Sequence, residues 1–222
     1  MVILLVADKM TKRFEIHECT NDQCGLRFPL DPRVYAGLYC PRCGSPTKVV
    51  EHVNEQIFLR SANATPHVAV SGLLDNLRSE LNVGAAFRTA NGAGLSHLYL
   101  CGITPTPAAN KRIAKTALGA EETVPWSYHS NALTLADQLK RSGAQLIALE
   151  GTRDALSLFD YSISPSDLRP MVLVVGGELA GVDPGLLDLC EKVLYIPMHG
   201  SKGSLNASVA FGIAAYRLIS HI

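Results

Sequence analysis

Short runs of aliphatic and β-branched residues alternate with amphipathic stretches through most of the chain after residue 66. The runs have the length of buried strands, and the stretches between them have the spacing of helices. Continuous apolar strands that alternate with helices are typical of a mostly parallel sheet with helices on both faces, which predicts an α/β fold. We expect strands at residues 68–74, 97–102, near 124, 145–150, 171–175 and 193–197, and helices at 83–93, 110–117, 133–141 and 206–219.

The first 60 residues do not share this pattern, and residues 60–66 form a polar stretch that is typical of a linker. We therefore expect a small N-terminal domain over residues 1–60 and an α/β domain over residues 61–222. The larger part, of about 160 residues, has an ordinary size for one domain. The 222 residues, of which 47% are hydrophobic and 18% charged, are enough for one full core and a small module.

Residues 2–7 are apolar, but the run is short and lacks a basic flank, so it predicts neither a signal peptide nor a membrane span. A cytoplasmic protein without membrane association is expected. The formal net charge is zero, so the chain is not a general binder of polyanions, and contact with nucleic acid would come from local patches. One candidate patch consists of Lys111, Arg112 and Lys115.

Four of the six cysteines have the spacing of metal ligands: Cys19 and Cys24 are separated by four residues, and Cys40 and Cys43 by two. Glycine follows Cys24 and Cys43, as in the tight turns of metal-binding knuckles. The N-terminal domain therefore resembles a zinc ribbon with a structural Zn²⁺. Replacement of one cysteine ligand by His17 is a less favoured alternative. This module would contact RNA or protein, and its basic and aromatic candidates are Arg27, Arg33, Arg42, Lys48, Phe28, Tyr35 and Tyr39.

Two of the loops that follow predicted strands are rich in glycine. Gly176 and Gly177 begin the loop after residues 171–175, and Gly200 and Gly203 lie in the loop after residues 193–197. Ligands of parallel sheets bind beyond the carboxyl ends of the strands, and glycine lets the backbone approach a ligand closely. Neither loop has the order of a phosphate-binding glycine motif, so nucleoside triphosphate chemistry is disfavoured.

Three separated segments share a pattern of glycine, asparagine and charged residues. They read Asn82-x-Gly84-x-x-x-Arg88, then Gly176-Gly177-Glu178-x-x-Gly181, then Ile196-Pro197-Met198-x-Gly200-x-x-x-Ser204-Leu205-Asn206. In this order they resemble the three motifs of SpoU/TrmH-type RNA methyltransferases, and the resemblance covers nearly all of residues 66–222. The second segment departs from that family, which usually has Asn at the position of Gly177 and often Gly at that of Leu179.

The resemblance implies methyl transfer from S-adenosylmethionine to a ribose 2′-hydroxyl of tRNA or rRNA. It also implies a homodimer whose chains each contain a C-terminal trefoil knot. It assigns catalytic roles to Arg88, Asn82, Glu178, Ser204 and Asn206. A side chain at Gly200 is expected to block the cofactor, which the resemblance places against Val175, Gly176, Gly177, Gly181, Ile196, Pro197, Met198, Gly200, Ser204 and Leu205.

The chemistry of each side chain limits its role. A guanidinium is protonated at ordinary pH, so Arg88 is expected to hold a phosphate and stabilise a developing oxyanion rather than to remove a proton. Asn82 and Ser204 are also suited to cap helices. Two alternatives follow from the altered second motif and from the chemistry: a non-catalytic RNA- or ribosome-binding protein on the same fold, and a methyltransferase that acts on a base.

Overall fold

The computed structural model of the chain describes residues 13–54, 68–164 and 166–220. The expected linker at 60–66 and the apolar run at 2–7 lie outside the described residues. The chain separates into two compact units, Met1–Asn63 and Ala64–Ile222.

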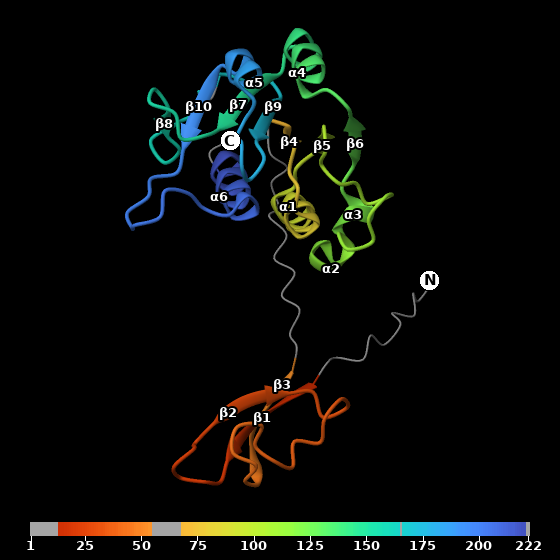
Figure 1. The fold of residues 1–222 in the computed structure, drawn as a ribbon, viewed down its shortest axis with the longest axis vertical. Helices are drawn as coiled ribbons and strands as arrows, with labels where there is room; N and C mark the ends of the chain where they lie inside the picture. Colours follow the sequence, from red (N-terminus) through yellow and green to blue (C-terminus); the bar gives the residue numbers. More distant parts are fainter. Residues whose placement is uncertain (1–12, 55–67, 165, 221–222) are drawn as a thin grey trace, which may run out of the picture. The chain divides into compact units, whose positions relative to one another are not determined.

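The first unit is a three-stranded antiparallel sheet with the order β2-β1-β3 (Figure 1). Its strands are β1 (Arg13–Cys19), β2 (Arg27–Leu30) and β3 (Thr47–Asn54). In its described part, the only buried side chains are those of His17, Cys19, Leu30 and Cys40. So small an apolar core contributes little to stability, which favours a cross-link of another kind.

The second unit contains a seven-stranded sheet in which all recorded strand pairs are parallel. Its order is β6-β5-β4-β9-β7-β10-β8. This observation confirms the predicted α/β class with a mostly parallel sheet, whereas the trefoil knot stays a prediction. The strands are β4 (Val70–Asp75), β5 (His97–Cys101), β6 (Trp126–His129), β7 (Gln145–Leu149), β8 (Leu156–Ser157), β9 (Met171–Val175) and β10 (Lys192–Tyr195).

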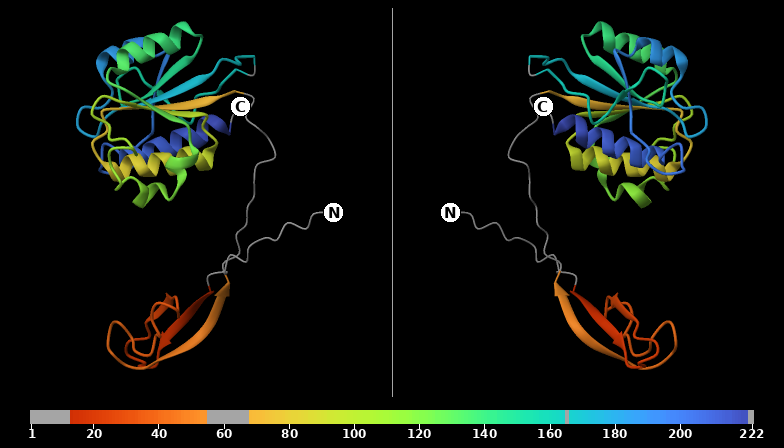
Figure 2. Two further views of the ribbon diagram at one scale, coloured as in Figure 1. Left: turned by 90° about the vertical axis from the view of Figure 1, so that its right-hand side faces the viewer. Right: turned by 90° about the vertical axis from the view of Figure 1, so that its left-hand side faces the viewer.

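Helices cover both faces of this sheet (Figure 2). Neighbouring strand residues point to opposite faces, so Leu73 packs in the core beneath α4 and α5, whereas Leu74 packs in the core beneath α1 and α6. The helices are α1 (Glu80–Ala93), α2 (Ala114–Ala117), α3 (Ala120–Thr123), α4 (Ala132–Arg141), α5 (Pro184–Leu189) and α6 (Ala207–Ile219). Among the described residues, no helix has the length and hydrophobicity that a bilayer crossing requires.

Several boundaries differ from those expected. Helix α1 begins at Glu80 because Ser79 is its N-cap, and the Ser79 side chain accepts a hydrogen bond from the backbone N–H of Asn82. Asn82 is therefore inside the helix and is not its cap. The strand expected near residue 124 begins at Trp126, because the short helix α3 occupies the residues before it.

Helices α1 and α6 lie against each other on one face of the sheet. Gly212 of α6 faces Thr89 of α1, and Ala214 is fully buried. Small residues on α6 thus allow close packing with a neighbouring helix of the same chain. This packing brings the first and third sequence motifs together.

Candidate functional site

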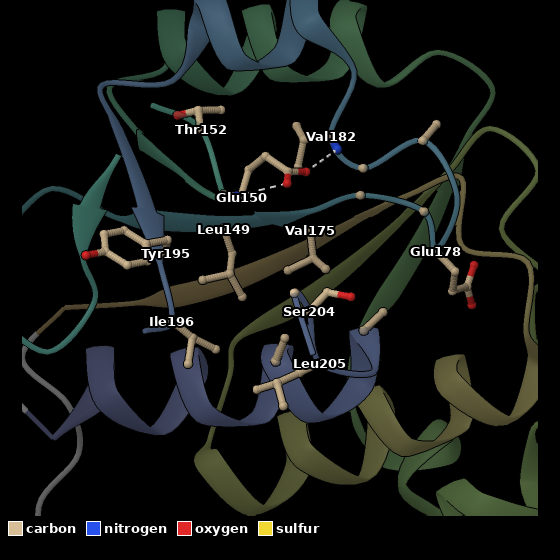
Figure 3. A pocket seen from close by; sticks show the side chains of 18 of the residues that line it. Leu149, Glu150, Thr152, Val175, Glu178, Val182, Tyr195, Ile196, Ser204 and Leu205 are labelled. Carbon is tan, nitrogen blue, oxygen red and sulfur yellow. Dashed lines mark hydrogen bonds between the residues drawn. The ribbon is translucent and has the colours of Figure 1, made fainter. Parts of the chain in front are cut away.

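A pocket of about 1010 Å³ lies at the carboxyl ends of β7, β9 and β10 (Figure 3). The loops that follow these three strands form its walls, which is the usual position of a ligand site in a parallel sheet. Ten of the sequence-predicted residues line it: Val175, Gly176, Gly177, Glu178, Gly181, Ile196, Met198, Ser204, Leu205 and Asn206. Pro197, Gly200, Asn82 and Arg88 are not among the lining residues.

The shape of the second motif depends on glycine. The backbone N–H of Gly181 donates a 3.0 Å hydrogen bond to the carbonyl of Gly177, which closes the loop. A Cβ atom at Gly176 would overlap the backbone of Gly181 and Val182, and one at Gly177 would lie 2.5 Å from the carbonyl oxygen of Asn76. The glycine at 177, which departs from the family pattern, therefore fits the close approach of Asn76 in this chain.

The third motif supplies another wall and then begins helix α6. Asn206 is the N-cap, because its side-chain oxygen accepts 3.0 Å and 3.4 Å hydrogen bonds from the N–H groups of Ser208 and Val209. Ser204 lines the pocket two residues earlier, so the capping role suggested for Ser204 belongs to Asn206. Gly200 has open space where a Cβ would lie and is outside the pocket lining, so a methyl side chain there would not block this pocket.

Three side chains from the three motifs form one hydrogen-bonded chain. The Asn82 amide donates to Glu178 over 2.8 Å, and the Asn206 amide donates to the Asn82 carbonyl oxygen over 3.0 Å. Asn82 is 9% exposed, and the other two line the pocket. Residues far apart in the sequence thus hold one another in fixed orientations at one end of the pocket.

Glu178 is an anion in this arrangement. Burial acts to raise the pKa of its carboxyl, but hydrogen bonds from the N–H groups of Arg78 and Ser79 and from the Asn82 amide prevail and lower it. At neutral pH Glu178 therefore only accepts hydrogen bonds. It orients Asn82 and joins the second motif to the start of α1.

The first motif is divided between two places. Gly84 allows α2 to pack closely against α1, since a Cβ there would overlap the carbonyl of Ile113, the N-cap of α2, and the hydroxyl of Thr116 within it. Arg88 is exposed and lines a separate cavity of about 570 Å³, together with Lys115 and Tyr216. Within the described part of the chain, Arg88 has no ion-pair partner.

The main pocket has an anionic lining. Its charged lining residues are Glu150 and Glu178, and none of the lining residues is Lys or Arg. Such a surface favours a cationic ligand and disfavours a polyphosphate. The charge therefore agrees with the exclusion of nucleoside triphosphates that the loop sequences indicate.

Sequence reasoning did not single out Glu150, Thr152 and Tyr195, which also line the pocket. Glu150 follows β7 directly, and its carboxylate accepts 2.9 Å hydrogen bonds from the N–H groups of Gly151 and Val182. Only its position in the sequence could have indicated Glu150. Residue 150 ends a predicted strand, and ligands of parallel sheets bind beyond the carboxyl ends of the strands.

The four cysteines of the first unit form one cluster. Their Sγ atoms all lie within 4.8 Å of one another; Cys19 and Cys43 are 3.4 Å apart, and Cys24 and Cys40 are 3.8 Å apart. Four sulfurs bound tetrahedrally to zinc at about 2.3 Å would be roughly 3.8 Å apart, so the cluster fits this ion. His17 is not part of it, since its ring nitrogens contact Thr47 and Glu15.

The local structure of the cluster also suits a metal. The N–H groups of Gly25 and Gly44 donate to the carbonyls of Asn21 and Cys40, which closes the two knuckle turns. Hydrogen bonds from the side chain and backbone of Ser45 lower the pKa of Cys43 to about 6. Burial raises the pKa of Cys19 to about 12, so of these two thiols it is Cys43 that is a thiolate at neutral pH and ready to bind a cation.

Three of the four basic residues proposed for the contact surface of this unit form ion pairs. Arg27 contacts Glu51 at 3.0 Å, Arg33 contacts Asp31 at 2.6 Å, and Lys48 contacts Glu18 at 3.1 Å. Tyr35 and Tyr39 are exposed, at 48% and 59%. The aromatic part of the expected contact surface is thus accessible, whereas three of its four cations are neutralised.

Comparison with known proteins agrees with this geometry. The family model described as "SpoU rRNA Methylase family" matches residues 70–216. The chain is 35% identical over 148 residues to the 23S rRNA (guanosine-2'-O-)-methyltransferase RlmB of a Burkholderia species, covering 66% of this chain and 57% of that protein. It is 32% identical over 143 residues to the tRNA (guanosine(18)-2'-O)-methyltransferase of Aquifex aeolicus, covering 64% of each.

Among solved structures, an AdoMet-bound rRNA methyltransferase from Sinorhizobium meliloti superposes with a TM-score of 0.61 at 26% identity. The match covers 67% of this chain and 55% of that one. In each of these comparisons, the chain spans less than two thirds of the length of the protein it matches.

Proposed function

Because the chain belongs to the SpoU rRNA methylase family, we propose that it transfers a methyl group from S-adenosylmethionine to a ribose 2′-hydroxyl of tRNA or rRNA. The observation that carries this proposal is the hydrogen-bonded chain Glu178–Asn82–Asn206, which brings all three motifs to one pocket. The relatives named above are ribose 2′-O-methyltransferases of both RNA classes. Cytoplasmic location stays a prediction.

The pocket suits the proposed cofactor in three respects. Its volume of about 1010 Å³ exceeds what a nucleoside-sized molecule requires, and its glycine loops present backbone groups directly. Its two carboxylates favour the net positive charge of a sulfonium with an ammonium group. When bound, S-adenosylmethionine supplies an electrophilic methyl group; Gly176, Gly177, Gly181, Ile196, Met198, Ser204 and Leu205 would hold it.

The residues of the hydrogen-bonded chain would position the nucleophile. Methyl transfer needs an in-line approach of the ribose oxygen, so rigid orientation is the main contribution that the protein can make. Glu178 orients the Asn82 amide, and the Asn82 carbonyl oxygen in turn orients the Asn206 amide. Ser204 adds a hydroxyl to the pocket lining. Arg88 would hold the adjacent phosphate and stabilise the oxyanion.

Arg88 lies outside the main pocket of its own chain, and a homodimer resolves this separation. Helices α1 and α6 carry large exposed apolar side chains, Leu81, Val209 and Tyr216, at 50%, 50% and 53% exposure. Exposed apolar groups on adjacent helices are typical of subunit interfaces. We place the two-fold interface there, so that Arg88 of one chain supplies a cation to the anionic pocket of the other.

Calorimetry with S-adenosylmethionine separates the proposed enzyme from a non-catalytic RNA-binding protein on the same fold. Heat of binding at micromolar protein and excess cofactor is expected, because the glycine loops are already closed around an anionic pocket. No heat under these conditions would favour the binding protein. A base methyltransferase would also bind the cofactor, so it is distinguished by the site of methylation.

We also propose that the four-cysteine cluster binds one structural Zn²⁺. Metal analysis should give about one zinc per chain, since four protein ligands fill a tetrahedral site. Cys40→Ser should release the metal and unfold the first unit, whereas cofactor binding should persist because the pocket is formed by the second unit. Cys190→Ala is the matched control and should retain zinc. Loss of cofactor binding in Cys40→Ser would show that the two units depend on each other.

A further inference from the structure

Glu150 is a pocket carboxylate that the three motifs do not include. It follows β7 at the carboxyl end of the sheet, and its backbone N–H donates a 2.9 Å hydrogen bond to the carbonyl of Leu194. Its side chain lines the main pocket and points toward Val182 (Figure 3). The position of this carboxylate is therefore set by two neighbouring strands and the end of the glycine loop.

The carboxylate has acceptor capacity that the protein does not use. Its two oxygens offer about four acceptor positions. Two recorded hydrogen bonds, from Gly151 and Val182, occupy one position on each oxygen. In the described part of the chain, no Lys, Arg or His forms an ion pair with Glu150. An anion thus faces the pocket with one free acceptor position on each oxygen.

Glu150 and Glu178 serve different parts of the pocket. Glu178 is bonded to Asn82 and to the start of α1, where the target ribose of the RNA is proposed to bind. Glu150 is bonded to Val182, at the other end of the glycine loop, and Figure 3 shows the two carboxylates well separated. The apolar side chains of Leu149, Val175 and Ile196 line the pocket beside it, which suits the flat face of a nucleobase.

We infer that the Glu150 carboxylate binds the ribose 2′- and 3′-hydroxyls of the cofactor's adenosine. This assignment rests on the proposed function and adds a residue to it. Two hydroxyls on adjacent carbons match the two oxygens of one carboxylate, and an acidic residue near a strand end binds ribose hydroxyls in this way in other parallel-sheet proteins. Glu150 is accordingly a cofactor-binding residue and takes no part in proton transfer.

Binding of S-adenosylhomocysteine and its 2′-deoxy and 3′-deoxy analogues, measured by calorimetry, tests this assignment without requiring turnover. In the unsubstituted protein, removing one hydroxyl should weaken binding by roughly tenfold to a hundredfold, the range for a hydrogen bond to a charged group. In Glu150→Gln, removing the same hydroxyl should weaken binding by a factor that is at least about five times smaller. The reason is that a neutral amide forms weaker hydrogen bonds than a carboxylate. Glu122→Gln, an exposed carboxyl on α3, should behave like the unsubstituted protein.

If removing a hydroxyl weakens binding by the same factor in the unsubstituted and Glu150→Gln chains, the assignment of Glu150 is wrong. The proposed function would remain intact. Failure of the unsubstituted protein to bind S-adenosylhomocysteine at all would overturn the proposed function as well. Melting temperatures verify that the variants are folded. If Glu150→Gln does not fold, Glu150→Asp replaces it, because the shorter side chain retains the charge but cannot reach both hydroxyls.

Discussion

Arg88→Ala is expected to lower the rate of methyl transfer by roughly two to four powers of ten, the range for losing a positioned catalytic group or an oxyanion-stabilising donor. Cofactor affinity should stay within a few-fold, because Arg88 does not line the pocket that the cofactor loops form. Single-turnover rates with RNA and calorimetry with the cofactor measure the two effects separately. Arg88→Lys should restore little activity, since an ammonium lacks the planar pair of donors that matches a phosphate.

Arg141→Ala is the matched control, because Arg141 is an exposed arginine on α4 that pairs with Asp137 of the same helix and is not among the residues that line either pocket. It should keep full activity. If Arg88→Ala also keeps full turnover on its RNA, Arg88 is an ordinary surface residue and its proposed role is wrong.

Mixed dimers test whether Arg88 acts on the pocket of the other chain. Chains with Arg88→Ala are mixed with chains whose own cofactor site is disrupted by Gly176→Ala. Action between chains would give one intact site in each mixed dimer, and random assortment would recover roughly a quarter of the unsubstituted rate. Action within one chain leaves no intact site, so the mixture would show no recovery.

Gly176→Ala is expected to weaken cofactor binding by roughly tenfold to a hundredfold, the scale of losing two hydrogen bonds from the displaced loop. The new Cβ would overlap the backbone of Gly181 and Val182, so the loop between them must open. The strand β9 ends at Val175 and its core is unaffected, so the chain should still fold. Calorimetry measures the affinity, and thermal unfolding verifies the fold.

Gly200→Ala is the control for this variant. Gly200 has no heavy atom within 4 Å of where its Cβ would lie and does not line the pocket, so its substitution should leave affinity unchanged. If Gly200→Ala strongly lowers the affinity for the cofactor while Gly176→Ala lowers it little, the cofactor does not bind against the loop that begins at Gly176.

The hydrophobic pattern was sufficient to predict the parallel sheet, because its central strands are buried on both faces and have continuous apolar sequences. The strand β9 matches its expected range of residues 171–175. Elements with weak patterns were missed: β8 has two residues, and α5 begins at Pro184 and contains Gly185, which are typical turn residues. Strand order is non-local and could not be obtained from the pattern alone.

Within the site, the residues of the second and third motifs could be found from the resemblance, but their contacts could not. Asn82 and Ser79 are both capping residue types, so the sequence did not reveal that Ser79 caps α1 while Asn82 binds Glu178. A single glutamate after a strand has no motif, so Glu150 required the structure. The separation of Arg88 from the pocket likewise depends on which face of α1 packs against the sheet.

Transfer of an isotopically labelled methyl group tests the central claim most directly. The protein is incubated with methyl-labelled S-adenosylmethionine and with RNA from a strain in which the gene for this protein is deleted. The RNA is then digested to nucleosides for mass spectrometry. We predict that the label appears on the ribose of a 2′-O-methylated nucleoside and that Arg88→Ala loses nearly all of it. Label on a base, or no label in RNA from such a strain while the cofactor is bound, would contradict the proposed ribose methyltransferase.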